Sequence, residues 1–329
     1  MLLTVGLNPY GLAYTLGLQG AGTPRANPTP LGLDEFIALA RAAGVHSIEL
    51  DHRWLMPLTN VQLAALGESL RDLAVVTSFW LSHRPAETLE QAVRCTKAVG
   101  ASVLRFHLTP VLEGGRAEIG QAWHDMVVHA RTTLRRESRR VADAGLTLAI
   151  EDHQDFGSEE LIEIAASLGD HVGITLDTGN PFSVGEDPLA FVERAGPLIR
   201  HVHLKDYVAQ FTDEGYRLVR CPVGDGCVPF AEMMRALGGN GSPLTASIEI
   251  AALEARHIRV FTDGWWSGYP ERNARELGVM LGRLRHNRLD DDADYRTPWE
   301  LGASPDAVVQ YERAQVQKSV ENLRAWGWM

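Results

Sequence analysis

The sequence has few cysteines and no pattern that would use them. Its 329 residues include three, Cys95, Cys221 and Cys227, without CxxC spacing. Zinc sites and disulfide frameworks need paired or closely spaced cysteines, so both are excluded as the basis of the fold. There is also no run of about 18 apolar residues, as a membrane span requires, and the opening MLLTVGLNPYGLAY lacks the basic segment and cleavage site of a signal peptide. We therefore expect a cytoplasmic protein.

An excess of basic residues is missing as well. The chain has 31 Lys and Arg against 42 Asp and Glu, a formal net charge of −11. Sequence-independent nucleic-acid binding depends on Lys and Arg clusters that neutralise phosphates, so this charge argues against it. The glycines after the first apolar run form no GxGxxG, which disfavours a bound dinucleotide. With 45% hydrophobic residues the chain is globular rather than disordered.

What the sequence does contain is a regular alternation of short β-branched runs with longer helix-patterned ones. The predicted strands are Leu2–Leu7, His46–Leu50, Ala74–Phe79, Ser102–His107, Leu146–Asp152, His171–Asp177, Ile199–Lys205 and Thr245–Ile250. The predicted helices are Leu33–Ala43, Val61–Leu70, Glu87–Val99, Ile119–Ala144, Ser158–Leu168, Pro188–Ala195, Pro229–Leu237 and Glu271–Arg285. Eight such units predict an α/β fold, a closed (β/α)₈ TIM barrel, over residues 1–286.

Two segments fall outside the repeat. The first, Tyr207–Gly226, is predicted to be a long loop after the seventh strand. The second is a C-terminal extension, residues 287–329, with a predicted helix from Pro305 to about Trp326 and three of the eight tryptophans. Aromatic residues at that density suggest a covered surface. Either a partner covers the extension, or it folds back under the bottom of its own barrel.

Polar residues end the last four predicted strands. The strand in LTLAIEDH ends at Glu151 and that in VGITLDTGN at Asp177, while IRHVHLKD contributes His203 and TASIEIAA contributes Glu249. The carboxyl ends of barrel strands form the working face of this fold, so the four side chains should meet there. Three buried carboxylates would repel one another unless a cation bound them. Oxygen ligands with one imidazole nitrogen suit Mn²⁺, Mg²⁺ or Co²⁺.

Several other side chains near these strand ends could act on a substrate. His153 lies two residues beyond Glu151, and His107 ends the fourth predicted strand. Both are candidate general bases. Lys205 is expected either to neutralise an enolate oxygen or to pair with Asp206. The candidate substrate-binding residues are Arg220, Asn180, Tyr10, His52 and Trp266, although for His52 a supporting or solvent role is the preferred interpretation.

With these residues in view, the chain resembles the xylose isomerase-like TIM-barrel superfamily of sugar isomerases and epimerases. The stretches that carry the resemblance are IEDH, LDTGN, HVHLKD, VGDG and IEI, within roughly residues 146–250. The resemblance implies a single divalent metal, Mn²⁺ foremost, on Glu151, Asp177, His203 and Glu249. The multi-metal DNA-repair branch is excluded, because its additional histidines are replaced here by Asn180 and Val208.

Within the superfamily, GLNPYGLAYTLGLQG, DEGYRLVRCPVGDG and the C-terminal extension are most similar to the large subunit of C-glycoside deglycosidases. That resemblance implies carbon–carbon cleavage of a 3-oxo-C-glycoside, with His153 or His107 as base and a small β subunit as partner. The first alternative is a ketose 3-epimerase or aldose–ketose isomerase, in which Glu151 and Glu249 would be the acid/base pair. A non-catalytic sugar-binding subunit is the second alternative.

Overall fold

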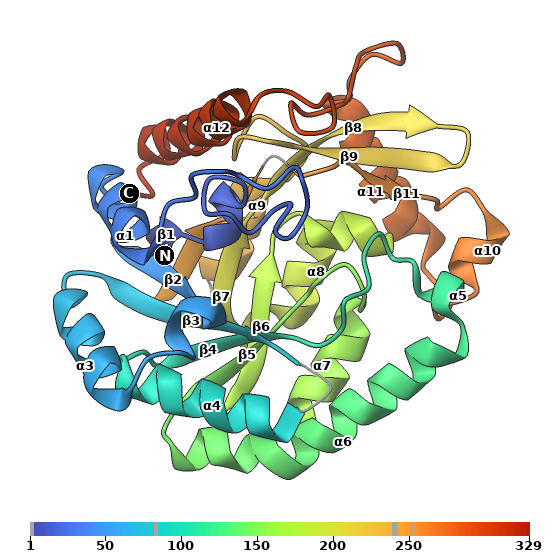
Figure 1. Cartoon of the computed structure of the whole chain (residues 1–329). Helices are drawn as coiled ribbons and strands as arrows, with labels where there is room; N and C mark the ends of the chain where they lie inside the picture. The colour runs from blue at the N-terminus through green and yellow to red at the C-terminus, as the bar shows by residue number, and fades with distance from the viewer. Residues whose placement is uncertain (1–2, 82–84, 239–242, 252) are drawn as a thin grey trace.

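The computed structural model describes residues 3–81, 85–238, 243–251 and 253–329. Within these ranges eight parallel strands close into a barrel, and helices wrap its outside (Figure 1). The strands are β1 (Leu3–Leu7), β2 (Ser47–Asp51), β3 (Ala74–Trp80), β4 (Val103–His107), β5 (Thr147–Glu151), β6 (Val172–Asp177), β7 (Ile199–Leu204) and β10 (Leu244–Ile248). Pairing of β10 with β1 closes the barrel, which confirms the predicted TIM-barrel fold.

The outer layer contains α1 (Leu33–Ala42), α3 (Asn60–Ser69), α4 (Pro85–Ala98), α6 (Gln121–Asp143), α7 (Ser158–Ala166), α8 (Pro188–Ala195), α9 (Phe230–Gly238) and α11 (Ala274–His286). Local sequence signals determine where several of these helices begin or end. Asp187 caps α8 by accepting the N–H groups of Leu189 at 3.0 Å and Ala190 at 3.1 Å, with Pro188 at the first helical position. Gly145, at φ +70°, follows the end of α6.

Alternation along the strands decides which side chains enter the barrel. In β7, the fully buried Val202 and Leu204 alternate with His201 and His203. Strands β2, β4, β5, β6 and β10 repeat this pattern. Aliphatic residues occupy one set of alternate positions, and the other set includes Glu49, Arg105, Glu151, Thr175, Asp177 and Ser247. Because successive side chains of a strand point to opposite faces, the aliphatic set packs under the helices and the polar set points into the barrel.

The prediction of a loop at Tyr207–Gly226 is wrong. The segment contains β8 (Asp206–Thr212) and β9 (Gly215–Cys221), an antiparallel hairpin that β11 (Arg256–Ile258) extends on the other side of β9. Figure 1 shows this small sheet projecting beyond the barrel. A side chain at Gly215 would collide with the carbonyl oxygen of Ile258, so the close approach of β11 requires glycine there.

The C-terminal extension folds onto its own barrel. Its helix α12 (Pro305–Ala325) contacts the short 3₁₀ helix η1 (Pro9–Leu12), which follows β1. The buried Glu312 carboxylate accepts the backbone N–H groups of Tyr14 at 2.9 Å and Thr15 at 2.8 Å. Farther along, Arg324 donates to the carbonyl of Ala43 at the end of α1. The extension thus lies along the flank of the barrel beside α1 (Figure 1), rather than under its bottom.

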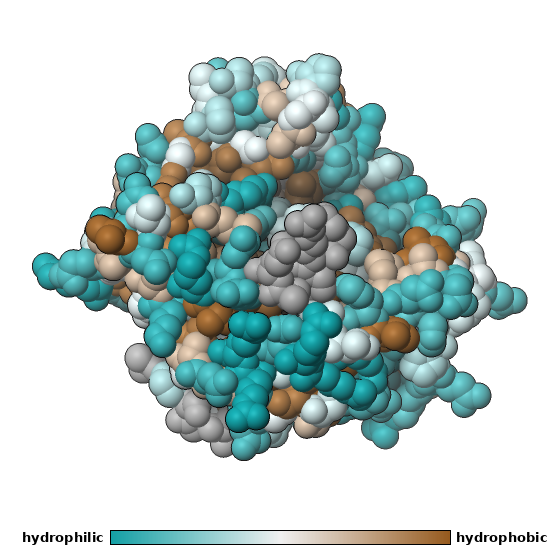
Figure 2. Space-filling view, turned by 60° about the horizontal axis from the view of Figure 1, so that its bottom comes forward, coloured by the Kyte–Doolittle hydropathy of each residue, from teal (hydrophilic) through white to brown (hydrophobic). Residues whose placement is uncertain are grey.

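The exterior is largely hydrophilic on the side drawn in Figure 2, where hydrophobic residues occur in small groups. Among the described residues, no helix combines the length and apolarity that crossing a bilayer would require. The remaining short helices are α2 (His52–Leu55), α5 (Arg116–Ile119) and α10 (Asp263–Trp266), with 3₁₀ helices η2 (Asn180–Val184) and η3 (Gly196–Leu198). Of these, α2 and η2 follow β2 and β6 at the carboxyl ends of the barrel strands, whereas α5 contacts α10.

Candidate active site

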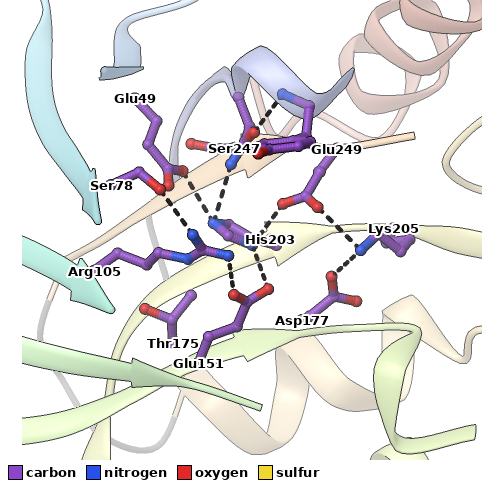
Figure 3. A network of polar contacts seen from close by, with 12 residues as sticks. Glu49, Ser78, Arg105, Glu151, Thr175, Asp177, His203, Lys205, Ser247 and Glu249 are labelled. Atoms are coloured by element: carbon purple, nitrogen blue, oxygen red, sulfur yellow. Dashed lines mark hydrogen bonds and ion pairs between the residues drawn. The ribbon is translucent and has the colours of Figure 1, made fainter. Parts of the chain in front are cut away.

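The structure brings together the four residues that end the last barrel strands. Glu151, Asp177, His203 and Glu249 each offer one ligand atom, and these four atoms lie within 4.8 Å of one another. Figure 3 shows both glutamates pointing at the imidazole of His203. Its Nδ1 atom lies 2.7 Å from Oε2 of Glu249 and 3.3 Å from Oε1 of Glu151. The four side chains thus meet at one place, as their positions at the strand ends predict.

Three atoms of this cluster suit a metal ion. Oε1 of Glu151, Oε2 of Glu249 and Nδ1 of His203 are buried, and both carboxylate oxygens lie within ion-pair distance of the one ring nitrogen. Buried carboxylates brought this close together need a cation to offset their repulsion. All three face the same small volume, and the donor set of carboxylate oxygens with one nitrogen is one that binds divalent cations. The cluster can therefore hold a divalent metal.

Two buried cations flank the cluster. Lys205 Nζ lies 2.5 Å from Oδ2 of Asp177 and 3.1 Å from Oε1 of Glu249. Burial by itself would lower the pKa of Lys205, but these two carboxylates raise it above its usual value, so the side chain is charged. On the other side, Arg105 donates to Oε2 of Glu151 and, at 2.8 Å, to Ser78. Each glutamate thus has one oxygen held by a cation and the other directed at His203.

The expected alternative for Lys205, pairing with Asp206, is wrong. The Asp206 carboxylate accepts backbone N–H groups instead, from Gly224 and Gly226 at 2.9 Å each and from Val228 at 3.0 Å. It organises the chain after β9. Adjacent residues of an extended chain point to opposite sides, which is why Lys205 reaches the mouth of the barrel and Asp206 does not.

The sequence analysis missed Glu49. Its Oε2 atom lies 2.9 Å from Nε2 of His203 and 3.2 Å from Nε2 of His201, and all three side chains are fully buried. Burial would raise the pKa of Glu49, but the two imidazoles hold it well below its usual value. Likewise burial would lower the pKa of His203, yet Glu49 and Glu249 raise it to about 9. The sequence SIELD, in which Glu49 interrupts an apolar alternation, was the available signal. It was missed because the search was limited to residues at strand ends, and Glu49 lies inside β2.

Glu49, His201 and His203 could in principle form a second metal site, because their ligand atoms are also close together. That group is fully buried, whereas Glu249 is 12% exposed and lines a cavity at the barrel mouth. A catalytic ion must be reached by substrate. Geometry therefore favours the Nδ1 side of His203 for a metal, with Glu49 orienting the ring from behind, as carboxylates commonly do for metal-bound histidines.

The cavity at the mouth has a volume of about 180 Å³. It is lined by Tyr10, Asp51, His52, Ser78, Phe79, Trp80, Arg105, His107, His153 and Glu249. The rings of His107 and His153 lie 5.0 Å apart. Burial lowers the pKa of His107 well below its usual value and, with help from Arg105, lowers that of His153 to about 3, so both rings are neutral. His52 accepts the indole N–H of Trp80 at 2.9 Å.

Three of the predicted substrate-binding residues do not line this cavity. Asn180 donates to the backbone oxygen of Asp152 at 3.0 Å, and its own N–H donates to Asp177, so it supports that carboxylate from behind. Trp266 packs on Trp265, and its indole N–H donates to the carbonyl of Val260. Arg220 lies on the hairpin sheet. Loop paths, which the sequence pattern does not predict, decide these positions.

Comparisons with known proteins agree with the fold. Residues 37–264 match the family described as Xylose isomerase-like TIM barrel. The uncharacterized protein YihM of Escherichia coli (strain K12) is 25% identical over 198 residues, 60% of this chain and 58% of that protein. An inosose dehydratase of Lacticaseibacillus casei is 28% identical over 126 residues, 33% of this chain and 42% of that protein. The chain thus matches about half the length of these curated relatives.

A solved structure of L-ribulose 3-epimerase superimposes with a TM-score of 0.55 at 16% identity, over 99% of this chain and 97% of that chain. At this identity the similarity concerns the fold alone.

Proposed function

The chain belongs to the xylose isomerase-like TIM barrel family, and we propose that it is a divalent-metal-dependent enzyme that removes the proton next to the carbonyl of a keto-sugar. One observation carries the proposal: a four-residue ligand cluster adjoins a cavity whose wall contains two neutral imidazoles. Family relatives include dehydratases, and proteins of the same fold include epimerases. Both kinds of reaction begin with a labile C–H bond beside a carbonyl.

Glu151, Asp177, His203 and Glu249 would hold the metal. Their donor set favours Mn²⁺, with Mg²⁺ or Co²⁺ as further candidates. When bound, such an ion acts as a Lewis acid on the carbonyl and acidifies the adjacent C–H bond. Lys205 and Arg105 keep the carboxylates in place, since each binds one oxygen of a glutamate. Glu49 fixes the imidazole of His203.

The contacts of the candidate bases favour a histidine over a glutamate. Glu151 already binds Arg105, and Glu249 already binds Lys205 and His203. By contrast, both ring nitrogens of His107 and Nδ1 of His153 are buried and have no hydrogen-bond partner among the residues that the structure describes. A neutral imidazole with an unoccupied lone pair in the cavity wall can accept the substrate proton.

We propose a lyase reaction on a 3-oxo-C-glycoside as the first candidate. His107 or His153 takes the proton from the carbon between the ketone and the anomeric carbon. The electron pair forms a carbon–carbon double bond in the sugar, the bond to the aglycone breaks, and a proton restores the aglycone C–H. A dehydratase relative supports an elimination, which is the same reaction class with water as the leaving group.

The alternative is a ketose 3-epimerase or sugar isomerase, supported by the fold shared with L-ribulose 3-epimerase. It requires an acid and a base on opposite faces of the substrate. Glu151 and Glu249 approach His203 from two strands that are not neighbours in the barrel, which would suit that task. A sugar-binding subunit without chemistry is the remaining candidate.

Metal-loaded protein incubated separately with a 3-oxo-C-glucoside and with D-fructose separates these candidates. Release of the aglycone, measured by chromatography, supports the lyase, whereas an epimer of fructose without release supports the alternative. Glu249→Gln is the control. If the wild type and this variant both bind sugar and neither turns it over, the chain is a binding subunit and the proposal is wrong.

We also propose, on the resemblance to C-glycoside deglycosidases, that a small β subunit binds this chain. The tryptophans of the C-terminal extension suggested a partner, but one of them is covered by the chain itself: Trp299 packs on Tyr14 with ring centroids 5.5 Å apart. Trp326 is 40% exposed, so the end of α12 is where a partner would bind. Co-expression with candidate small subunits, followed by size-exclusion chromatography, tests this.

A further inference from the structure

The hairpin sheet carries two arginines on its inner face. Arg256 of β11 lies opposite Leu218, and Arg220 of β9 lies opposite Tyr207. Leu218 and Arg220 are two residues apart on one strand, so Arg256, Arg220 and Tyr207 all belong to the same face. The other members of that face include Tyr216, Leu218 and Ile258, all fully buried. Arg220 is buried on this face, whereas Arg256 is half-buried.

These arginines have no carboxylate partner in the part of the chain that the structure describes. The guanidinium of Arg220 lies over the ring of Tyr207, 5.8 Å from its centroid. Arg220 donates to the backbone oxygen of Glu254 at 3.0 Å, while the Glu254 carboxylate accepts from the indole of Trp299 at 2.8 Å. Among the described residues, Nε of Arg256 and the hydroxyl of Tyr207 are buried and have no hydrogen-bond partner. A buried arginine beside a half-buried one with an unused buried donor indicates a site for an anion.

The group lies beside the metal-ligand cluster. Tyr207 follows Lys205 by two residues, and its ring covers the backbone of Gly179, where an added Cβ would be 2.6 Å from Cε2 of Tyr207. The N–H of Gly179 donates to Asp177 at 3.0 Å. Arg220, Arg256 and Tyr207 do not themselves line the cavity at the barrel mouth, so a substrate would have to extend beyond that cavity to place its anionic group here.

We propose that Arg220, Arg256 and the hydroxyl of Tyr207 form an oxyanion subsite that binds a carboxylate, phosphate or sulfonate group of the substrate. The proposal rests on the proposed function and deepens it, because the keto-sugar or its aglycone would then carry a negative charge. The protein as a whole has a formal charge of −11 and would repel such a substrate. A local pair of arginines overcomes this repulsion at the point of binding.

The first test measures anion binding without turnover. Thermal unfolding of the full chain is followed while inorganic phosphate, sulfate or acetate is titrated at constant ionic strength. We expect saturable stabilisation of the wild type by at least one of these anions. Arg256→Gln should weaken the apparent affinity at least about tenfold, and Tyr207→Phe severalfold, because each removes a donor to a charged acceptor.

Arg217→Gln is the matched control. Arg217 lies on the same strand but on the opposite face, with its guanidinium 4.4 Å from the ring centroid of Tyr295. This variant should bind anions like the wild type. If Arg256→Gln does not fold, Arg256→Lys replaces it, since it keeps the charge but removes the planar fork of donors. The absence of saturable stabilisation in the wild type, or equal losses in Arg256→Gln and Arg217→Gln, would overturn the subsite.

A second arm separates this subsite from the proposed function and identifies the anion. D-Glucuronate, D-glucose 6-phosphate and D-glucose are compared as ligands of wild type and of Glu249→Gln. Tighter binding of a charged sugar than of glucose, retained in Glu249→Gln but lost in Arg256→Gln, supports the subsite even if no keto-sugar is turned over. Equal binding of all three sugars refutes the subsite while leaving the keto-sugar reaction open.

Discussion

Replacing Glu49 by glutamine tests how the metal centre is supported. Glu49 lies behind His203, 2.9 Å from Nε2, while the ligand cluster lies on the Nδ1 side. Glutamine preserves the size of the side chain but removes the charge. The imidazole of His203 would keep its place in β7 and lose the carboxylate that fixes its orientation and proton. The metal would then bind to a less basic and less well oriented nitrogen.

The expected magnitude follows from similar supporting carboxylates. Their removal weakens metal binding by about 10- to 100-fold, which corresponds to about 1.4–2.7 kcal/mol. Isothermal titration of Mn²⁺ into chelator-stripped protein measures this change directly. Glu68→Gln is the control, because Glu68 on α3 is 71% exposed, pairs with Arg71 and takes no part in the ligand cluster.

Two results would refute this reasoning. Unchanged Mn²⁺ affinity in a folded Glu49→Gln protein would show that Glu49 does not support the ligand. Complete loss of binding in Glu49→Gln, together with normal binding in Glu249→Gln, would place the metal on the Nε2 side of His203 with Glu49 and His201.

Three further predictions concern catalysis and stability. Chelation should lower the melting temperature, because Mn²⁺ at about 100 times its dissociation constant would stabilise the protein by about 2.7 kcal/mol; calorimetry that finds no metal dependence would contradict the site. His107→Gln should lower turnover by about 10²- to 10⁴-fold without altering Mn²⁺ affinity if His107 is the base, and normal turnover would assign that role to His153. Glu312→Ala should destabilise the fold by about 3 kcal/mol in urea unfolding, because the N–H groups of Tyr14 and Thr15 lose their buried acceptor; a change below about 0.5 kcal/mol would show that α12 contributes little.

The sequence by itself determined the barrel and the convergence of four polar side chains. Eight strand-like runs alternate with helical ones, and parallel strands wrapped by helices have few ways to close. Residues at the carboxyl ends of such strands must meet at one mouth, so Glu151, Asp177, His203 and Glu249 could be placed together from their positions alone.

Tertiary structure decided the remaining contacts. Glu49 and Arg105 lie inside β2 and β4, and local alternation indicates only the face on which they lie, because their partners come from other strands. The path of the hairpin sheet and the place of α12 on the flank depend on long-range contacts such as those of Glu312. Periodicity fixes the face on which a side chain lies, but the identity of its neighbour is fixed only when the barrel closes.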